Sequence, residues 1–298
     1  MEYIDAKTIV TNAGKPNRDY MAFEYVMNIY RGCSHGCIYC YARSSYYEKG
    51  DFDCVRAKKD ALRIIRDDIL RKKKKGVVFT AGMSDAYNPE EREHKLTRNA
   101  LELINAFRFG VCILTKSELV TRDTDILVDI KEHSPASVNF TITCADDELC
   151  GRIEPFVSPS SKRFKAIEHL SKNGIICGVF MDPVLPYITD TPENVREMVK
   201  MAKHHGAGYM YISTQVTMAD VQREHFYTQA EKYYPGISDR YREKFKEYYY
   251  CRSPHGKKLW NTFVEACVKE GMRYDMRAAN RMIRRKYDNI EEQGELDF

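Results

Sequence analysis

Short apolar runs alternate with longer amphipathic segments along the chain from residue 24 onward. Apolar runs of about 4–8 residues bounded by turn-forming residues are typical of buried strands, whereas a spacing of three to four residues is typical of helices. The pattern predicts six strands, over residues 24–30, 77–81, 111–115, 137–143, 175–181 and 208–213. It predicts intervening helices over residues 55–75, 90–106, 123–132, 160–172 and 191–205.

Strands that alternate with helices favour an α/β fold with a parallel sheet and right-handed crossovers. Six strand–helix units are too few for a closed eight-stranded barrel. In either kind of α/β fold, ligand sites form at the carboxyl ends of the strands. Beyond residue 218 the sequence becomes charged and tyrosine-rich, with predicted helices over residues 219–233, 238–250, 257–270 and 275–288. We therefore predict two domains, residues 1–218 and a helical C-terminal extension over residues 219–298.

The composition is that of a soluble globular protein, because 43% of the 298 residues are hydrophobic and 30% are charged. No apolar run is long enough to span a membrane, and the first residues do not resemble a secretory signal. We therefore expect a cytoplasmic protein without a membrane partner, in which the ten cysteines are reduced. The net charge of +4 permits nucleic-acid binding but supports it only weakly.

The most informative motif consists of Cys33, Cys37 and Cys40, spaced C-x₃-C-x₂-C in a loop after the first predicted strand. Cysteine thiolates usually bind all four irons of a [4Fe–4S] cluster, so three cysteines leave one iron open to another ligand. The alternative is a structural zinc site, which would be closed by a fourth ligand such as Cys54 or His35. The spacing favours the cluster, because no second pair of closely spaced cysteines follows.

The cysteine spacing, with the aromatic Tyr39 just before the third cysteine, resembles the signature of radical S-adenosylmethionine (SAM) enzymes. The order of the other motifs resembles the spore photoproduct lyase-like branch of that superfamily, many of whose members are labelled DNA repair photolyases. These motifs are Arg31–Arg43, Ser84–Glu91, Leu114–Ser117, Arg152–Pro155 with Arg163, and Pro183–Pro186.

The resemblance implies an open six-unit (β/α)6 partial TIM barrel, which the C-terminal extension would close or flank. It also implies two cofactors, a [4Fe–4S] cluster and S-adenosylmethionine, and a reductant such as flavodoxin or ferredoxin. Enzymes of this kind cleave S-adenosylmethionine reductively, and the resulting 5′-deoxyadenosyl radical abstracts hydrogen from a substrate. The protein positions the cofactor and excludes water.

When the motifs of the family are matched to this sequence residue by residue, the resemblance assigns Cys33, Cys37 and Cys40 as ligands of the cluster. It places Tyr39 beside the adenine of S-adenosylmethionine. Tyr39 and Tyr41 flank the last cysteine, as do the tyrosines linked to radical transfer in spore photoproduct lyase, which makes both of them candidate catalytic residues.

Other candidates follow the predicted strands. The resemblance places Ser84, Asp85 and Lys116 near the methionine end of S-adenosylmethionine. Thr143 lies on the polar side of the fourth strand and is a candidate contact for the ribose. Each has a simpler interpretation: Ser84 and Asp85 as turn residues, Lys116 as a surface lysine and Thr143 as part of a polar layer in the barrel.

The chain departs from spore photoproduct lyase at one position. That enzyme has a hydrogen-donating cysteine just before its Ser-Asp pair, whereas residues 80–83 here are Thr-Ala-Gly-Met. Repair of a pyrimidine photoproduct in DNA is therefore an alternative, in which Cys112 or Cys144 would have to supply the thiol. A second alternative is a non-enzymatic binding module stabilised by zinc.

Overall fold

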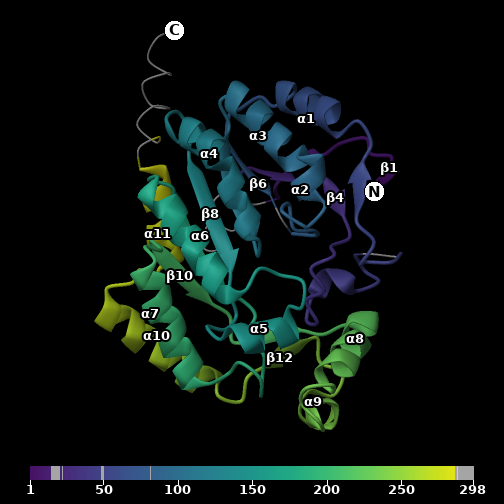
Figure 1. Cartoon of the computed structure of the whole chain (residues 1–298), viewed down its shortest axis with the longest axis vertical. Helices are drawn as coiled ribbons and strands as arrows, with labels where there is room; N and C mark the ends of the chain where they lie inside the picture. Colours follow the sequence, from purple (N-terminus) through teal and green to yellow (C-terminus); the bar gives the residue numbers. More distant parts are fainter. Residues whose placement is uncertain (15–20, 22, 48–49, 81, 286, 288–298) are drawn as a thin grey trace.

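The computed structural model describes residues 1–14, 21, 23–47, 50–80, 82–285 and 287. At its centre is a sheet of seven strands in the order β10-β9-β8-β7-β6-β3-β2 (Figure 1). Six neighbouring strands run parallel, and β2 runs antiparallel to β3. The strands are β2 (Val10–Asn12), β3 (Tyr25–Met27), β6 (Val77–Thr80), β7 (Gly110–Thr115), β8 (Ala136–Thr141), β9 (Ile176–Met181) and β10 (Tyr209–Ile212).

The six parallel strands coincide with the six predicted apolar runs, which confirms the mixed α/β class. Ala81, the last residue of the second predicted strand, lies outside the described residues. Strand β2 was not predicted, because its only buried residue is Val10 and it therefore lacks an apolar run. The sheet consequently has one strand more than the hydrophobic pattern indicates.

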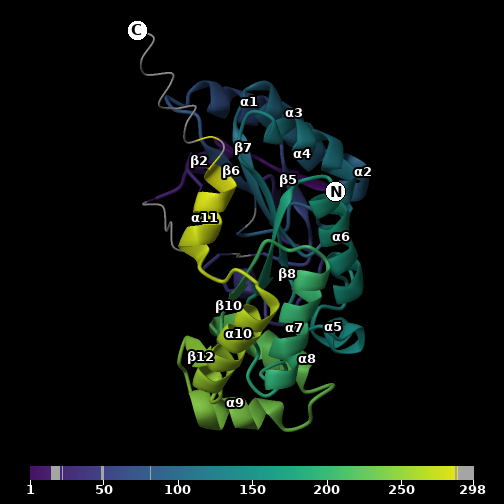
Figure 2. The ribbon, with the colours of Figure 1, turned by 90° about the vertical axis from the view of Figure 1, so that its left-hand side faces the viewer.

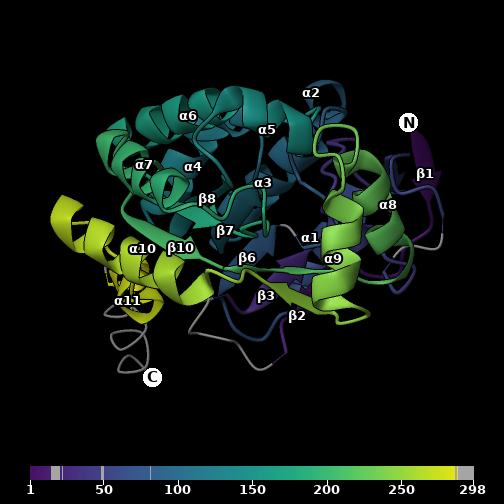
Figure 3. The same ribbon diagram turned by 90° about the horizontal axis from the view of Figure 1, so that it is seen from below.

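Helices connect the parallel strands and cover one face of the sheet, as Figure 3 shows for α4, α6 and α7. The predicted segment 55–75 begins with strand β5, and the segment 90–106 is two helices separated by Lys95, whose φ of 52° ends the first helix. Among the described residues, no helix is both long enough and apolar enough to cross a lipid bilayer. The helices are α1 (Ala61–Leu70), α2 (Glu91–His94), α3 (Leu96–Ala106), α4 (Thr124–Lys131), α5 (Asp147–Ile153), α6 (Ser160–Lys172) and α7 (Pro192–His204).

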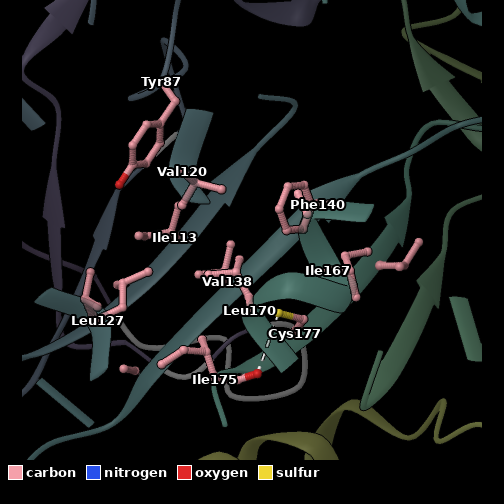
Figure 4. Close-up of a cluster of buried hydrophobic side chains, with 14 of the residues drawn as sticks. Tyr87, Ile113, Val120, Leu127, Val138, Phe140, Ile167, Leu170, Ile175 and Cys177 are labelled. Atoms are coloured by element: carbon pink, nitrogen blue, oxygen red, sulfur yellow. Dashed lines mark hydrogen bonds between the residues drawn. The ribbon is translucent and has the colours of Figure 1, made fainter. Parts of the chain in front are cut away.

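The alternation of side chains along the strands divides the core into two layers. On the face covered by helices, Ile113, Val138 and Phe140 form one buried cluster with residues of α6 such as Ile167 and Leu170 (Figure 4). On the opposite face, Phe79, Phe180 and Tyr209 pack against helix α11 (Met276–Arg284).

Shorter elements complete the fold. A three-stranded sheet joins β1 (Glu2–Ile4), β5 (Arg56–Lys58) and β4 (Tyr30–Arg31). Strand β4 leads into the cysteine loop, which ends at the 3₁₀ helix η1 (Tyr41–Arg43); a second 3₁₀ helix, η2 (Glu118–Asp123), follows β7.

The C-terminal extension contains the four predicted helices, α8 (Asp220–Ala230), α9 (Ile237–Phe245), α10 (Gly256–Glu270) and α11. The prediction of a helix up to residue 250 was wrong, because α9 ends at Phe245 and Lys246 has a φ of 48°. Strand β12 (Tyr250–Arg252) follows instead and pairs with β11 (Gln215–Thr217).

The extension flanks the β10 edge of the sheet, where α10 packs along α7 (Figure 2). The backbone N–H of Met210 in β10 donates to the carbonyl of Arg273 over 2.8 Å, and Phe263 of α10 belongs to the same core as the central strands. The two parts therefore share one hydrophobic core, and their division into domains at residues 218 and 219 remains a prediction. Residues 288–298 of the predicted extension lie outside the described residues.

Replacing Phe263 with alanine tests this shared core. Phe263 is 1% exposed, whereas Trp260 on the same helix is 47% exposed and serves as a control. Removing a buried phenyl ring costs about 3–5 kcal/mol. We expect Phe263→Ala to lower the free energy of unfolding by this amount in urea denaturation, and Trp260→Ala to lower it clearly less. Equal losses would contradict the packing of α10 against the core.

Candidate active site

A cavity of about 550 Å³ lies at the carboxyl ends of the parallel strands. Its lining includes residues that directly follow three of these strands: Lys116 after β7, Asp182 after β9 and Ser213 after β10. The loop that follows β6 contributes Ser84 and Asp85. The cavity is thus at the position where α/β folds bind their ligands.

Cys33, Cys37 and Cys40 all line this cavity, in the loop that connects β4 to η1. The loop depends on two glycines with positive φ, Gly32 (76°) and Gly36 (69°). A Cβ atom at Gly32 would lie 2.5 Å from the carbonyl oxygen of Cys54, and one at Gly36 would lie 2.8 Å from the ring of Phe156. Any larger residue at either position would therefore displace the loop.

The three thiols are largely shielded from water, because Cys33 and Cys37 are buried and Cys40 is half-buried. Burial raises the pKa of Cys33 to about 12, aided by the negative charge of Asp85, and burial also raises the pKa values of Cys37 and Cys40. At neutral pH these thiols are protonated until a metal displaces the protons.

The thiols fit a cluster better than a single zinc ion. Cys54, the fourth ligand of the zinc alternative, is exposed and does not line the cavity. Within the described ranges, no group of three or more His, Cys, Asp or Glu side chains is arranged to hold one metal ion. Each cysteine of a cluster binds a different iron, so the sulfurs need not converge on one point, whereas four zinc ligands must.

Asp85 lies at the centre of a hydrogen-bond network that joins three loops. Its Oδ1 accepts hydrogen bonds from the Thr115 hydroxyl over 2.7 Å and from the Tyr87 backbone N–H over 2.8 Å. Its Oδ2 accepts from the Lys116 backbone N–H over 2.8 Å and lies 3.5 Å from Nδ1 of His35 in the cysteine loop. The carboxylate is therefore occupied by protein donors, which supports a role in positioning the loops.

Ser84 and Lys116 were both predicted at the methionine end of the cofactor, and both line the cavity. The Ser84 hydroxyl donates to the Gly32 carbonyl over 2.5 Å and so holds the start of the cysteine loop. Lys116 Nζ lies 5.8 Å from the ring centre of Tyr39, and within the described part of the chain no carboxylate lies within 4.0 Å of it.

Lys116 remains charged in this setting. Burial alone would lower its pKa, but acidic neighbours outweigh burial and raise it: the carboxylates of Glu154 and Asp85, and also Cys37 and Cys40 once a metal has displaced their protons. The Lys116 ammonium is therefore a cation on the cavity wall that can attract an anionic group.

The two tyrosines that flank Cys40 differ in their surroundings, although both line the cavity. The Tyr39 hydroxyl is turned away toward Glu154, to which it donates a hydrogen bond. Tyr41 is 40% exposed, and its hydroxyl donates a hydrogen bond to the Gly82 carbonyl. Its ring makes an edge-to-face contact with the ring of Tyr47, with 5.5 Å between the ring centres. Burial raises the pKa of Tyr41 to about 12, so its phenol is neutral.

Residues 27–202 match the family described as the radical SAM superfamily. The chain belongs to this superfamily. Its cofactors are accordingly a [4Fe–4S] cluster and S-adenosylmethionine. The resemblance found from the cysteine spacing is thus confirmed.

Two relatives show how much of the chain is shared. Uncharacterized protein MJ0683 of Methanocaldococcus jannaschii is 39% identical over 169 residues, which are 56% of this chain and 62% of that protein. Uncharacterized protein Rv2578c of Mycobacterium tuberculosis is 28% identical over 243 residues, which are 78% of this chain and 70% of that protein. The chain therefore spans less than two thirds of its archaeal relative.

The fold is similar to that of spore photoproduct lyase. A mutant of that enzyme superposes with a TM-score of 0.67 and 15% identity, covering 92% of this chain and 81% of that chain. Its complex with dinucleoside spore photoproduct gives a TM-score of 0.64 and 17% identity, covering 90% and 78% of the two chains. The radical S-adenosylmethionine methyltransferase TsrM of Kitasatospora setae superposes with a TM-score of 0.55 and 12% identity. The match covers 85% of this chain and 52% of that chain. At these identities the similarity concerns the fold alone.

Thr143 does not line the cavity of this radical SAM protein, whereas Thr141 does. Strand β8 ends at Thr141, so the chain leaves the strand alternation before Thr143, which is buried. The structure therefore does not support a ribose contact for Thr143. Cys112 and Cys144 are likewise buried and absent from the cavity lining, so neither thiol reaches the site.

Sequence reasoning missed the wall of the cavity that the extension contributes. Gln215 and Thr217 of β11 line the cavity together with Tyr249, which directly precedes β12. The run of three tyrosines at residues 248–250 was the available signal, because aromatic residues favour strands, but the predicted helix obscured it. Among the other tyrosines of the chain, Tyr47 and Tyr211 also line the cavity, whereas Tyr46 and Tyr87 do not.

The Asp85 network leads to a stability prediction. In Asp85→Asn, the amide oxygen can replace one carboxylate oxygen, but the NH₂ group then faces another donor. A hydrogen bond to a charged group contributes about 1.5–3 kcal/mol, so we expect a loss of that size in the free energy of unfolding, measured with urea. The control is Asp125→Asn, which affects an exposed pair with Arg98 and should cost less than about 1 kcal/mol. An unchanged stability of Asp85→Asn would show that the network does not hold the loops.

Proposed function

We propose that this chain is an enzyme in which Cys33, Cys37 and Cys40 bind three irons of the [4Fe–4S] cluster and leave the fourth facing the cavity. The observation that carries this proposal is that the three thiols line one cavity at the carboxyl ends of the parallel strands. When bound and reduced, the cluster would supply the electron for reductive cleavage of S-adenosylmethionine, and the 5′-deoxyadenosyl radical produced would abstract hydrogen from a substrate.

The residues of the chain would bind and orient the cofactor. The charged ammonium of Lys116 suits the carboxylate of the methionine moiety, and the ring of Tyr39 offers an apolar surface for the adenine. Ser84 and Asp85 would act mainly by holding the loops that carry Lys116 and the cysteines, since their side chains are engaged with protein groups.

The remaining cavity would receive the substrate. Tyr41, Tyr47 and Tyr249 line it, and two of them come from the cysteine loop region and one from the C-terminal extension. We propose that the sheet acts as the open (β/α)6 partial TIM barrel of the superfamily and that the extension closes its cavity against water. Turnover also requires a reductant such as flavodoxin or ferredoxin.

The second candidate function is reductive repair of a pyrimidine photoproduct in DNA. The fold similarity to spore photoproduct lyase with its dinucleoside photoproduct favours it. Among the described residues, however, the cavity is lined by no cysteine other than the three proposed cluster ligands. A thiol donor of the kind used by that lyase therefore has no counterpart here. Stimulation of 5′-deoxyadenosine formation by damaged DNA, but not by intact DNA, would support repair.

Metal analysis distinguishes the cluster from the zinc-stabilised module. After anaerobic reconstitution, we expect iron and labile sulfide in the unaltered chain and in Cys54→Ser, because Cys54 lies off the cavity. Cys33→Ala should lose most of both, because its thiol would bind one of the irons. Tightly bound zinc that disappears in Cys54→Ser would support the module instead.

The function itself is tested by incubating the reconstituted protein with dithionite and S-adenosylmethionine and measuring 5′-deoxyadenosine. We expect product from the unaltered chain. Lys116→Met should weaken binding of S-adenosylmethionine by roughly 10- to 100-fold, the equivalent of one lost hydrogen bond to a charged group.

The control for Lys116 is Lys162→Met, which removes an exposed lysine paired with Glu118. Its affinity for S-adenosylmethionine should equal that of the unaltered chain. Absence of 5′-deoxyadenosine from a fully loaded unaltered chain would contradict the proposed chemistry. Normal affinity in Lys116→Met would refute only the assignment of that residue.

A further inference from the structure

A completely buried ion pair lies behind the cysteine loop. Nη2 of Arg163 is 2.5 Å from Oε2 of Glu154, and both side chains are 0% exposed. Removing two charges from water costs several kcal/mol per ion, and the pair recovers this only with good geometry and further hydrogen bonds. This costly ion pair lies next to the loop that carries the proposed cluster ligands, because Glu154 accepts a hydrogen bond from Tyr39 of that loop.

Arg163 is anchored on the side of the pair that faces the sheet. Its Nη1 donates to the carbonyl of Thr141 at the end of β8 over 2.6 Å, and its Nε donates to the carbonyl of Ser158 over 2.7 Å. Nη2 also donates to the sulfur of Cys150 over 2.8 Å. These contacts fix the guanidinium and leave it no freedom to approach the cysteine loop.

Glu154 is on the side of the pair that faces the loop. Its Oε1 accepts the hydrogen bond from the Tyr39 hydroxyl. The residues around it also pair with the loop backbone: Ile38 N–H donates to the Ile153 carbonyl over 3.0 Å, and Phe156 N–H donates to the His35 carbonyl over 3.2 Å. The negative end of the ion pair is thus directed at the loop that carries the cysteines.

We propose that Glu154, oriented by Arg163, is a positioning residue that holds Tyr39 and lowers the reduction potential of the cluster. This inference rests on the proposed binding of the cluster by Cys33, Cys37 and Cys40. Reduction adds negative charge to the cluster, and a fixed carboxylate in a surrounding of low dielectric constant opposes that addition. A cluster that is harder to reduce is a stronger electron donor once it is reduced.

Two cations also act near the cluster loop. Arg163 neutralises part of the charge of Glu154, but it lies on the far side of the carboxylate from the Tyr39 hydroxyl, to which Glu154 Oε1 is bonded. Lys116 Nζ lies 5.8 Å from the centre of the Tyr39 ring, and its ammonium favours the reduced cluster. Binding of an anionic ligand by Lys116 would weaken that influence and leave the effect of the Glu154 carboxylate larger.

A matched control lies on the helix that precedes Glu154. Arg152 was grouped with Glu154 and Arg163 by sequence, but its partner is the exposed Glu148, whose side chain is 77% exposed. Glu148→Gln removes the same charge from the same segment at a site where water screens it. It should therefore change neither the loop nor the cluster.

The test is the midpoint potential of the reconstituted cluster without S-adenosylmethionine, followed by EPR in a dye-mediated titration. Glu154→Gln keeps the size and an acceptor oxygen but removes the charge, so we expect a shift to a more positive potential. Tyr39→Phe keeps the charge, so its potential should shift less, but amide hydrogen exchange of residues 33–41 in the apoprotein should become faster. Glu148→Gln should match the unaltered chain in both measurements.

An unchanged potential in Glu154→Gln, or an equal shift in Glu148→Gln, would overturn the electrostatic role. Unchanged exchange in Tyr39→Phe would overturn the positioning role. If Glu154→Gln fails to take up a cluster, Glu154→Asp is the deciding variant. Uptake of a cluster by Glu154→Asp supports a requirement for the negative charge. Failure of both variants refutes the requirement for the charge. Absence of a cluster from the unaltered chain would instead contradict the proposed function, so the two failures are distinguishable.

Discussion

The site depends on holding three largely buried thiols, those of Cys33, Cys37 and Cys40, on one wall of a cavity. Burial raises the pKa values of Cys33, Cys37 and Cys40, so these thiols do not hold the loop in place through charge, and other contacts must stabilise it. A loop with two glycines at positive φ cannot supply that stability alone. The surrounding elements provide it through hydrogen bonds to the loop.

These hydrogen bonds come from three distant parts of the chain. Ser84 holds the Gly32 carbonyl, and the C-terminal end of α5 with the residues that follow it pairs with Ile38 and His35. From the C-terminal extension, Nε2 of Gln222 donates to the Tyr39 carbonyl over 3.1 Å. The extension therefore takes part in building the site as well as in covering the sheet, which links the stability of the whole chain to the geometry of the cysteines.

Local patterns predicted much of this arrangement. The six parallel strands are visible as apolar runs because both faces of the sheet are buried. The placement of the three cysteines and of Lys116 along one cavity follows from spacing and from the rule that strand ends meet at one edge. Interactions between distant residues were not predictable, such as the occupation of the Asp85 carboxylate by Thr115 and the pairing of Glu154 with Arg163. Thr143 lies outside the cavity lining because strand β8 ends at Thr141, so the alternation assumed for it does not continue, and its ribose contact stays a prediction.

The central claim is that one iron of the cluster is left open toward the cavity for S-adenosylmethionine. Mössbauer spectroscopy of protein reconstituted with ⁵⁷Fe tests it most directly, because it resolves the individual irons of the cluster. The account predicts that adding S-adenosylmethionine changes the signal of one iron in four and leaves the other three unchanged. A spectrum in which no iron responds to S-adenosylmethionine would contradict the account.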